Sequence, residues 1–263
     1  MAVSTVEPGR PDTVFGGLSP AKDFSTARTL LLLPSRLILF AAFQAIIAAV
    51  LWRVNGSFGF QNASIYWPFA ALGANIVTIV ILSQAFGREG KSLASVYSFA
   101  RGTVGKDIIA TIVVFVIAAP VSFLPSSLLG TMLFGDANAT TAVMFGRMPV
   151  IAAVATLAFP ITIVFAELPL YLGYILPRLS SKTGSRAVAT IVVGLFLALQ
   201  HCTLPLVLDW RFVIWRFGMF LPLALWLAFA FVWRPRLLPY MMIGHGLLDL
   251  ATVALVISSS LNP

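Results

Sequence analysis

The sequence predicts an all-α membrane protein, a polytopic bundle of about seven transmembrane helices with its N-terminus in the cytoplasm. Hydrophobic residues make up 59% of the 263 residues and charged residues only 10%, and the mean hydropathy is +0.97. A soluble domain averages about 25% charged residues, so this chain is too apolar to be one. The basic residues fall in short gaps between apolar runs, where they would meet lipid headgroups; we therefore expect membrane lipids as partners and no nucleic acid.

The first 28 residues show no apolar periodicity. They contain three prolines and a Gly16-Gly17 pair, which is typical of a disordered tail, here a cytoplasmic one. The first apolar run starts too late and is too long for a cleaved signal peptide, so we expect a retained anchor. Residues 29–258 then form one transmembrane domain, and residues 259–263 form a short tail.

Seven later segments are each long and apolar enough to cross a bilayer, which takes roughly 20 residues. These segments are 35–54, 65–86, 108–129, 149–176, 187–208, 212–233 and 237–258. An eighth crossing would be present if the region 108–148 held two. Three amides within the first two segments are expected to form interhelical hydrogen bonds: Gln44, Asn75 and Gln84.

Residues 88–107, between the second and third segments, carry an apolar stripe. Its members recur at three- and four-residue steps and are Leu93, Val96, Tyr97, Ala100 and Val104. This spacing fits an amphipathic helix lying on the membrane surface, and a solvated linker fits it equally well.

The distribution of Lys and Arg predicts the orientation. If the N-terminus is cytoplasmic, thirteen of the seventeen basic residues lie in cytoplasmic segments, among them Arg36 at the edge of the first span. The positive-inside rule therefore favours this orientation, with an external C-terminus after seven crossings. Arg216 lies near the external end of the sixth span, from which a long side chain can reach the interface.

Four ionisable residues lie deep within predicted spans: Glu167, His201, His245 and Asp249. An ionisable group at this depth costs several kcal/mol unless it finds a polar partner, so each is a functional-site hypothesis by default. With a rise of about 1.5 Å per residue, the four lie roughly 13 to 22 Å from the cytoplasmic edge and so share one layer. His245 and Asp249 are four residues apart and share a helix face.

These residue types suit the hydrolysis of an acyl bond by water. A carboxylate beside a histidine can hold a water molecule and remove its proton. A second histidine, with an acceptor behind it, keeps one tautomer and presents an N–H to a developing oxyanion. The single cysteine, Cys202, excludes an intrachain disulfide. It directly follows His201, so its side chain points about 100° away around the helix and we interpret it as a packing residue.

Three motifs carry a resemblance to a known family. E-L-P-L-Y-L-G-Y-I-L-P-R-L begins at Glu167, L-A-L-Q-H ends at His201, and H-G-L-L-D spans 245–249. Together they resemble the type II CAAX prenyl endopeptidase family, also called the CAAX protease and bacteriocin-processing (Abi) family of intramembrane glutamate proteases. Its motifs are E-E-x-x-x-R, F-x-x-x-H and H-x-x-x-N/D on successive membrane helices. The resemblance covers about 150–258.

The resemblance implies a reaction and a place for it. It implies that Glu167 and His201 activate the water, while His245 and Asp249 stabilise the oxyanion. It also implies a membrane-tethered peptide or protein substrate, a bacterial cytoplasmic membrane, and no cofactor or metal.

The first two motifs depart from the family pattern. Leu168 stands in place of the second glutamate, Leu172 in place of the arginine, and Leu197 in place of the phenylalanine of the second motif. Losing the glutamate and the arginine together is physically coherent, because either charge alone in lipid would be costly. The G-Y-I-L-P-R-L tail at 173–179 fits the family pattern and fixes the register.

Three functions stay open. The first is an intramembrane endopeptidase whose site opens toward the cytoplasm. The second is a metal-dependent membrane hydrolase, since two imidazoles and two carboxylates suit a divalent ion, although the sequence has no H-E-x-x-H helix. The third is a catalytically degenerate scaffold or immunity-type partner protein, which Leu168 and Leu172 favour. A transporter is less favoured because no internal repeat is present. The sequence predicts no oligomeric state.

Overall fold

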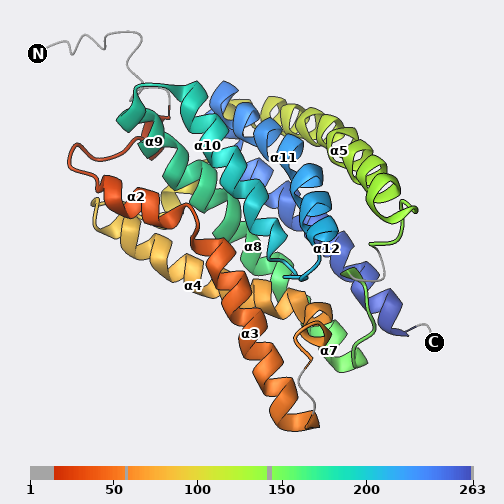
Figure 1. The fold of residues 1–263 in the computed structure, drawn as a ribbon. Coiled ribbons are helices and arrows are strands. Elements are labelled where there is room, and N and C mark those ends of the chain that lie inside the picture. The colour runs from red at the N-terminus through yellow and green to blue at the C-terminus, as the bar shows by residue number, and fades with distance from the viewer. Residues whose placement is uncertain (1–14, 57–58, 141–143, 262–263) are drawn as a thin grey trace, which may run out of the picture.

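The computed structural model describes residues 15–56, 59–140 and 144–261, and over these ranges every regular element is a helix (Figure 1). Six helical segments are long and apolar enough to span a membrane: Ser35–Val54, Asn62–Gly87, Leu93–Phe134, Val150–Thr183, Trp210–Trp233 and Pro235–Leu261. A seventh apolar segment, Arg186–Cys202, is shorter. The all-α membrane bundle is confirmed. In the described part of 108–148 only one helix is long enough to cross, so it supplies no eighth span.

Some of the long helices are joined by short turns and others by longer segments, and in one place they run end to end. The α-helices are α2 (Thr26–Leu32), α3 (Ser35–Asn55), α4 (Trp67–Gly87), α5 (Val104–Phe134), α7 (Val150–Ala155), α8 (Ala158–Leu168), α9 (Leu176–Thr183), α10 (Arg186–Leu199), α11 (Trp210–Trp233) and α12 (Leu238–Leu261). A π-helical segment, η5 (Pro169–Ile175), joins α8 to α9, and a 3₁₀ turn, η6 (Gln200–Cys202), follows α10.

Local residue chemistry explains several of the helix ends. Gly184, at φ +66°, ends α9 in the left-handed conformation that a glycine adopts without a steric penalty. The hydroxyl of Ser185 then accepts a hydrogen bond from the N–H of Val188 and begins α10. The carboxylate of Asp209 caps the first turn of α11 in the same way.

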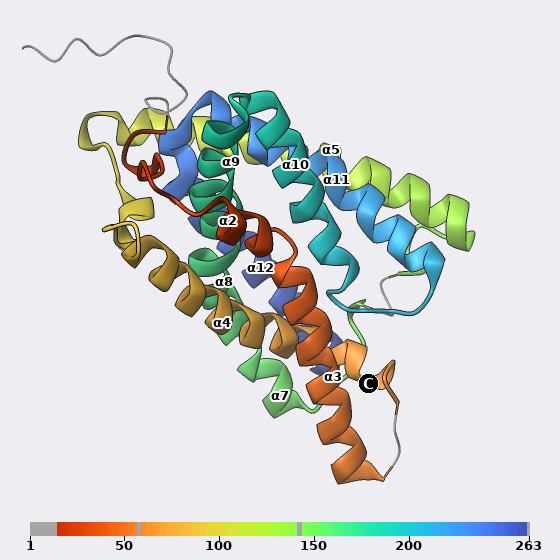
Figure 2. The same ribbon diagram turned by 60° about the vertical axis from the view of Figure 1, so that its left-hand side comes forward.

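The helices form two groups, which contact each other where η5 and α9 pack on α10 and where α12 packs on α5. On one side α3 packs on α4, α4 on α8 and α8 on α12; on the other, α10 packs on α11 and α11 on α5 (Figures 1 and 2). All residues of η5 are buried, so the continuous α8–η5–α9 segment runs through the centre of the bundle. The polar residues of its middle therefore face protein rather than lipid.

The outer surface of the bundle is apolar. Ile151 on α7, Val116 on α5 and Leu247 on α12 are 87%, 65% and 62% exposed, and many other large aliphatic side chains face outward as well. A soluble protein rarely carries such a continuous apolar surface, whereas a lipid-facing helix requires one. The protein is therefore an integral membrane protein.

Residues 15–28 differ from the disordered tail that we expected. Phe15 and Leu18 are buried, and the ring of Phe15 stacks on that of Phe231 with centroids 5.6 Å apart. These two apolar side chains bury surface against the bundle, and this burial offsets the entropy lost by ordering the segment. The rest of the predicted tail, 1–14, lies outside the described residues.

The amphipathic helix, one of the two interpretations of 88–107, is absent from the structure. Two short 3₁₀ turns, η3 (Leu93–Tyr97) and η4 (Arg101–Thr103), precede the start of α5. Of the stripe residues, Val96 is buried against the core while Val104 is 37% exposed, so the apolar stripe reflects scattered contacts rather than one helical face.

A buried ion pair connects the loop after α4 with α9. Arg178 Nη2 lies 2.6 Å from Glu89 Oε2 and Nε lies 2.8 Å from Oε1, with side-chain exposures of 0% and 3%. The hydroxyl of Tyr174 donates to the same carboxylate at 2.9 Å. Burial raises the pKa of Glu89, but the hydrogen bonds and charge of Arg178 outweigh burial and hold it below its ordinary value of 4.5.

Replacing Glu89 with Gln should lower the apparent Tm, because Arg178 would keep a buried charge without a counter-ion. Removal of one partner from a buried pair costs about 3–5 kcal/mol. Thermal unfolding in detergent micelles measures the loss. The matched control is Arg211→Gln, which removes a partner from a largely exposed pair and should leave the apparent Tm close to that of the wild type.

The same pair predicts a pH dependence. Because the folded-state pKa of Glu89 is depressed, its stabilising contribution is fully present above pH 4.5 and is lost as the pH falls through the folded-state pKa. The Tm difference between wild type and Glu89→Gln should therefore narrow in acid. A difference that stays constant on acidification would contradict the ion-pair assignment.

Candidate active site

Glu167 lies where the regular α-helix stops. It is the penultimate residue of α8, and the π-helical turn that begins at Pro169 follows directly. Proline has no N–H and clashes with the carbonyl four residues earlier, so α-helical hydrogen bonding cannot continue unchanged here. Single π-helical turns are frequent at functional sites. Glu167 itself is only 3% exposed.

The carboxylate of Glu167 lies between a guanidinium and an imidazole. Its Oε2 accepts a hydrogen bond from Arg36 Nη2 at 3.4 Å, and its Oε1 lies 3.1 Å from His245 Nε2. The contact with His245 is at ion-pair distance, but its angle does not satisfy hydrogen-bond geometry. Side chains from α3, α8 and α12 thus meet at one carboxylate.

Arg36 is a site residue that the sequence analysis missed. We counted it as a cytoplasmic charge at a span edge, whereas its side chain is 0% exposed. Its Nε donates to Gln200 Oε1 at 2.7 Å and its Nη1 to Asn75 Oδ1 at 2.9 Å. A signal was available, because Arg36 is flanked by apolar residues on both sides, from Leu30 to Phe40, and does not lie in a polar gap.

The structure places the three amide side chains Gln44, Asn75 and Gln84 in different surroundings. Asn75 contacts Arg36 as described, and Gln44 pairs with the backbone of Leu206 through two hydrogen bonds of 2.7 Å. The interhelical hydrogen bond that we expected is therefore confirmed for Asn75, whereas Gln44 bonds to the loop between α10 and α11. Gln84 is exposed instead.

One ring nitrogen of His201 is hydrogen-bonded to the backbone. Its Nδ1 lies 2.8 Å from the carbonyl oxygen of Leu197. A carbonyl can only accept, so Nδ1 carries the proton and Nε2 carries the lone pair. The ring stacks on Phe220, with centroids 3.7 Å apart and an interplanar angle of 10°. The orientation of His201 is thereby fixed, and its basic nitrogen is available to a proton donor.

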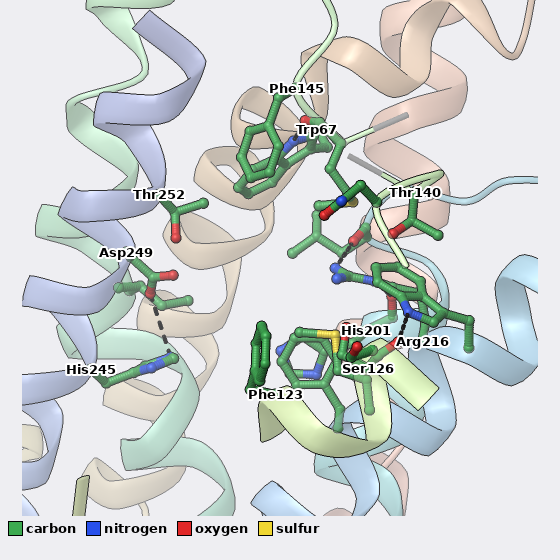
Figure 3. A pocket seen from close by; sticks show the side chains of 18 of the residues that line it. Trp67, Phe123, Ser126, Thr140, Phe145, His201, Arg216, His245, Asp249 and Thr252 are labelled. Carbon is green, nitrogen blue, oxygen red and sulfur yellow. Dashed lines mark hydrogen bonds and ion pairs between the residues drawn. The ribbon is translucent and has the colours of Figure 1, made fainter. Parts of the chain in front are cut away.

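His245 and Asp249 lie on one face of α12, as the sequence predicted. His245 Nε2 is 3.5 Å from Asp249 Oδ2 (Figure 3). The same nitrogen, Nε2, also approaches Glu167. Asp249 therefore does not accept a hydrogen bond from the other ring nitrogen, Nδ1, as we expected. Because His245 Nε2 lies between two carboxylates, this placement favours the form of the ring in which Nε2 carries a proton. In the described chain neither His245 Nε2 nor Asp249 Oδ2 has an aligned hydrogen-bond partner.

One cavity of about 360 Å³ is lined by all four predicted residues, Glu167, His201, His245 and Asp249. Within the described chain Glu167 and His201 form no hydrogen bond or ion pair, so a molecule in the cavity would have to connect them. A second cavity, of about 320 Å³, shares His201 and His245 and is otherwise lined mainly by apolar side chains such as Leu227.

The cavity lies toward the end of the bundle that we predicted to be external. Its wall includes Ser126 near the end of α5 and Asn138, Thr140 and Phe145 from the segment that follows (Figure 3). Our expectation of a site opening toward the cytoplasm is therefore inconsistent with the predicted orientation of the helices.

Arg216 does not reach the interface as we expected. It is 5% exposed, and it lines the cavity beside His201. Its Nη2 donates to the carbonyl of Leu204 at 2.5 Å and its Nε to the carbonyl of His201 at 3.3 Å.

The carboxylates and imidazoles do not form a metal cage. Over the described residues, no three His, Cys, Asp or Glu side chains are placed to hold an ion together. Glu167 and Asp249 instead both approach the single nitrogen of His245.

Comparisons of the chain with protein-family models, curated proteins and solved structures found no match. Function must therefore be argued from the site. The two leucines that depart from the first motif, Leu168 and Leu172, are buried in the apolar core, where a charge would lack a partner.

Replacing Arg36 with Met should destabilise the protein by about 3–5 kcal/mol, because Glu167 would lose its counter-ion in the membrane interior. Adding Glu167→Gln to Arg36→Met should recover part of the loss, since neither charge then remains. Thermal unfolding of the four proteins closes the double-mutant cycle. Arg53→Met, at the exposed far end of α3, is the control. Strictly additive effects would show that Arg36 and Glu167 do not interact.

Proposed function

We propose that this protein is an intramembrane endopeptidase that hydrolyses a peptide bond of a membrane-associated substrate with water held in the cavity. One observation supports it above others: the four ionisable residues that the sequence placed deep within apolar segments, Glu167, His201, His245 and Asp249, line a single cavity in the interior of the bundle. Hydrolysis within a membrane requires an enclosed polar space where water stays next to a base. The three motifs that resemble the intramembrane glutamate proteases point to the same reaction.

In this proposal the water molecule lies between Glu167 and His201. Glu167 accepts one of its hydrogen bonds, and Nε2 of His201, which carries the lone pair, removes the other proton. The hydroxide oxygen forms a bond to the carbonyl carbon of the substrate, and the carbonyl π-electrons move to its oxygen. His201 then gives its proton to the amide nitrogen, the electron pair of the oxyanion re-forms the C=O bond as the C–N bond breaks, and a carboxylic acid and an amine result. The acid then passes its remaining proton to the amine, which leaves a carboxylate and an ammonium.

His245 is the proposed donor to the oxyanion. Its Nε2–H lies between two carboxylates but is aligned with neither, so it can turn to a substrate oxygen without losing an established hydrogen bond. A donor preorganised in a water-poor site is worth about 10²–10³-fold in rate. Asp249 offsets the positive charge that His245 carries as the oxyanion develops.

Arg36 is a positioning residue in this mechanism. It holds one oxygen of Glu167 and is itself fixed by Gln200 and Asn75, so the other oxygen faces His245. With leucine at position 172, this guanidinium from α3 is the cation that compensates the charge of Glu167.

A catalytically inactive scaffold is the second candidate, and Leu168 and Leu172 favour it because they depart from the first motif. A metal-dependent hydrolase remains a third. The endopeptidase, the scaffold and the metal-dependent hydrolase differ in whether cleavage occurs and in whether a chelator stops it.

His201→Ala should reduce proteolysis by at least about 10²-fold, because it removes the general base. Glu167→Gln should reduce proteolysis by a similar factor, because it removes the carboxylate that positions the water. The assay reconstitutes the protein in liposomes with a library of membrane-anchored peptides and identifies cleavage products by mass spectrometry. Cys202→Ala, which alters a buried packing residue next to His201, is the matched control and should keep its activity.

Undiminished cleavage by Glu167→Gln would reject this mechanism. Loss of wild-type cleavage in the presence of a chelator, restored by a divalent ion, would identify the metal-dependent hydrolase. If the variant lacking all four ionisable side chains fully complements a deletion strain, the scaffold function is correct.

A further inference from the structure

The wall of the cavity carries a buried cation that the proposed mechanism does not use. Arg216 lies on α11, 5% exposed, and forms no ion pair with any described carboxylate. Two of its five N–H groups donate to the carbonyls of His201 and Leu204. The nearest electron-rich groups are the rings of Phe220 and Trp215, whose centroids lie 4.8 and 5.5 Å from the guanidinium carbon.

These contacts compensate the charge of Arg216 only in part. A buried arginine without an anion is costly, because neutral carbonyls and aromatic rings replace only some of its hydration. By contrast, Arg36, the other buried arginine of the site, is paired with Glu167. The cavity that Arg216 lines gives an anion a place to approach the guanidinium without displacing protein.

The cavity is electrostatically polarised. His245 and Asp249 lie on one wall, while Arg216 lies on the opposite wall together with Ser126 and Thr140 (Figure 3). His201 stands next to Arg216 and stacks on the same Phe220 ring as the guanidinium. A ligand held by Arg216 would therefore extend past His201 toward the acidic wall.

We propose that Arg216 binds a carboxylate of the peptide substrate and so fixes the position of the substrate in the cavity. A guanidinium binds a carboxylate through two parallel N–H···O bonds, which sets direction as well as affinity. A lipid phosphate shares this charge, but a cavity of about 360 Å³ suits a short peptide segment and is too small for a diacyl lipid. The proposal rests on the proposed function for the nature of the ligand.

The test measures binding rather than cleavage, so it stays informative if the protein proves to have no peptidase activity. The inactive variant Glu167→Gln, in nanodiscs, is titrated with three fluorescent apolar tripeptides. The first has a free C-terminal carboxylate, the second a C-terminal amide, and the third an amide together with one Asp side chain. We expect one of the carboxylate peptides to bind about ten- to a hundredfold more tightly than the neutral amide, as a charge-assisted hydrogen bond implies. The carboxylate peptide that binds more tightly shows whether Arg216 binds a C-terminal carboxylate or an Asp side chain.

Adding Arg216→Met to Glu167→Gln should abolish the preference for the carboxylate peptide, while the affinity for the neutral amide peptide stays unchanged. Arg216→Lys should retain part of the preference, because it keeps the charge but loses the planar fork. Arg211→Met is the matched control: it removes an exposed arginine from the same helix and should preserve the preference in full.

Equal binding of all three peptides to Glu167→Gln would overturn the proposal even if the Arg216 variants failed to fold. A preference for the carboxylate peptide that persists in the Arg216→Met variant would also overturn the proposal. If short-chain phosphatidylglycerol displaces the carboxylate peptide from Glu167→Gln, and binds only when Arg216 is present, the residue recognises a lipid phosphate and the proposal is wrong.

Discussion

The contact of Glu167 with Arg36 and His245 is the constraint on which the rest of the structure depends. A carboxylate in the interior of a membrane protein is tolerated only with compensating partners, and here these come from the first and last long helices, α3 and α12. Because Arg36 is fixed in turn by Gln200 and Asn75, the same contact also orients α4 and the end of α10. The arrangement of the bundle and the geometry of the cavity therefore have one physical cause.

The site combines a rigid half and an adaptable half. Arg36 and His201 are held by well-aligned hydrogen bonds and by ring stacking, and so cannot easily turn. His245 and Asp249 are close to Glu167 and to each other but are not aligned for hydrogen bonding. The proposed hydrolysis would use both properties: an imidazole base that is held in one orientation, and an N–H donor that no protein acceptor has taken up.

Much of the candidate site could be predicted because insertion into lipid penalises charge so strongly. Glu167, His201, His245 and Asp249 stood out as ionisable residues in apolar spans, and the structure places all four around one cavity. Arg36 and Arg216 were misjudged for a related reason. Each lies near a predicted span end, where a long side chain can point either to the interface or to the interior, and hydropathy does not distinguish the two.

Residue order alone is enough to identify the membrane class, the positions of the long helices and the deep ionisable residues, because each follows from local hydropathy and from the cost of burying charge. Which of these residues meet depends on how the helices pack. The tertiary structure pairs Glu167 with His245 and Arg36 rather than with His201, and it directs the cavity toward the segment after α5. It also orders residues 15–28 against the bundle. Such contacts join residues that are far apart in the chain, and they depend on helix tilt and rotation, which packing between helices sets and residue order alone does not encode.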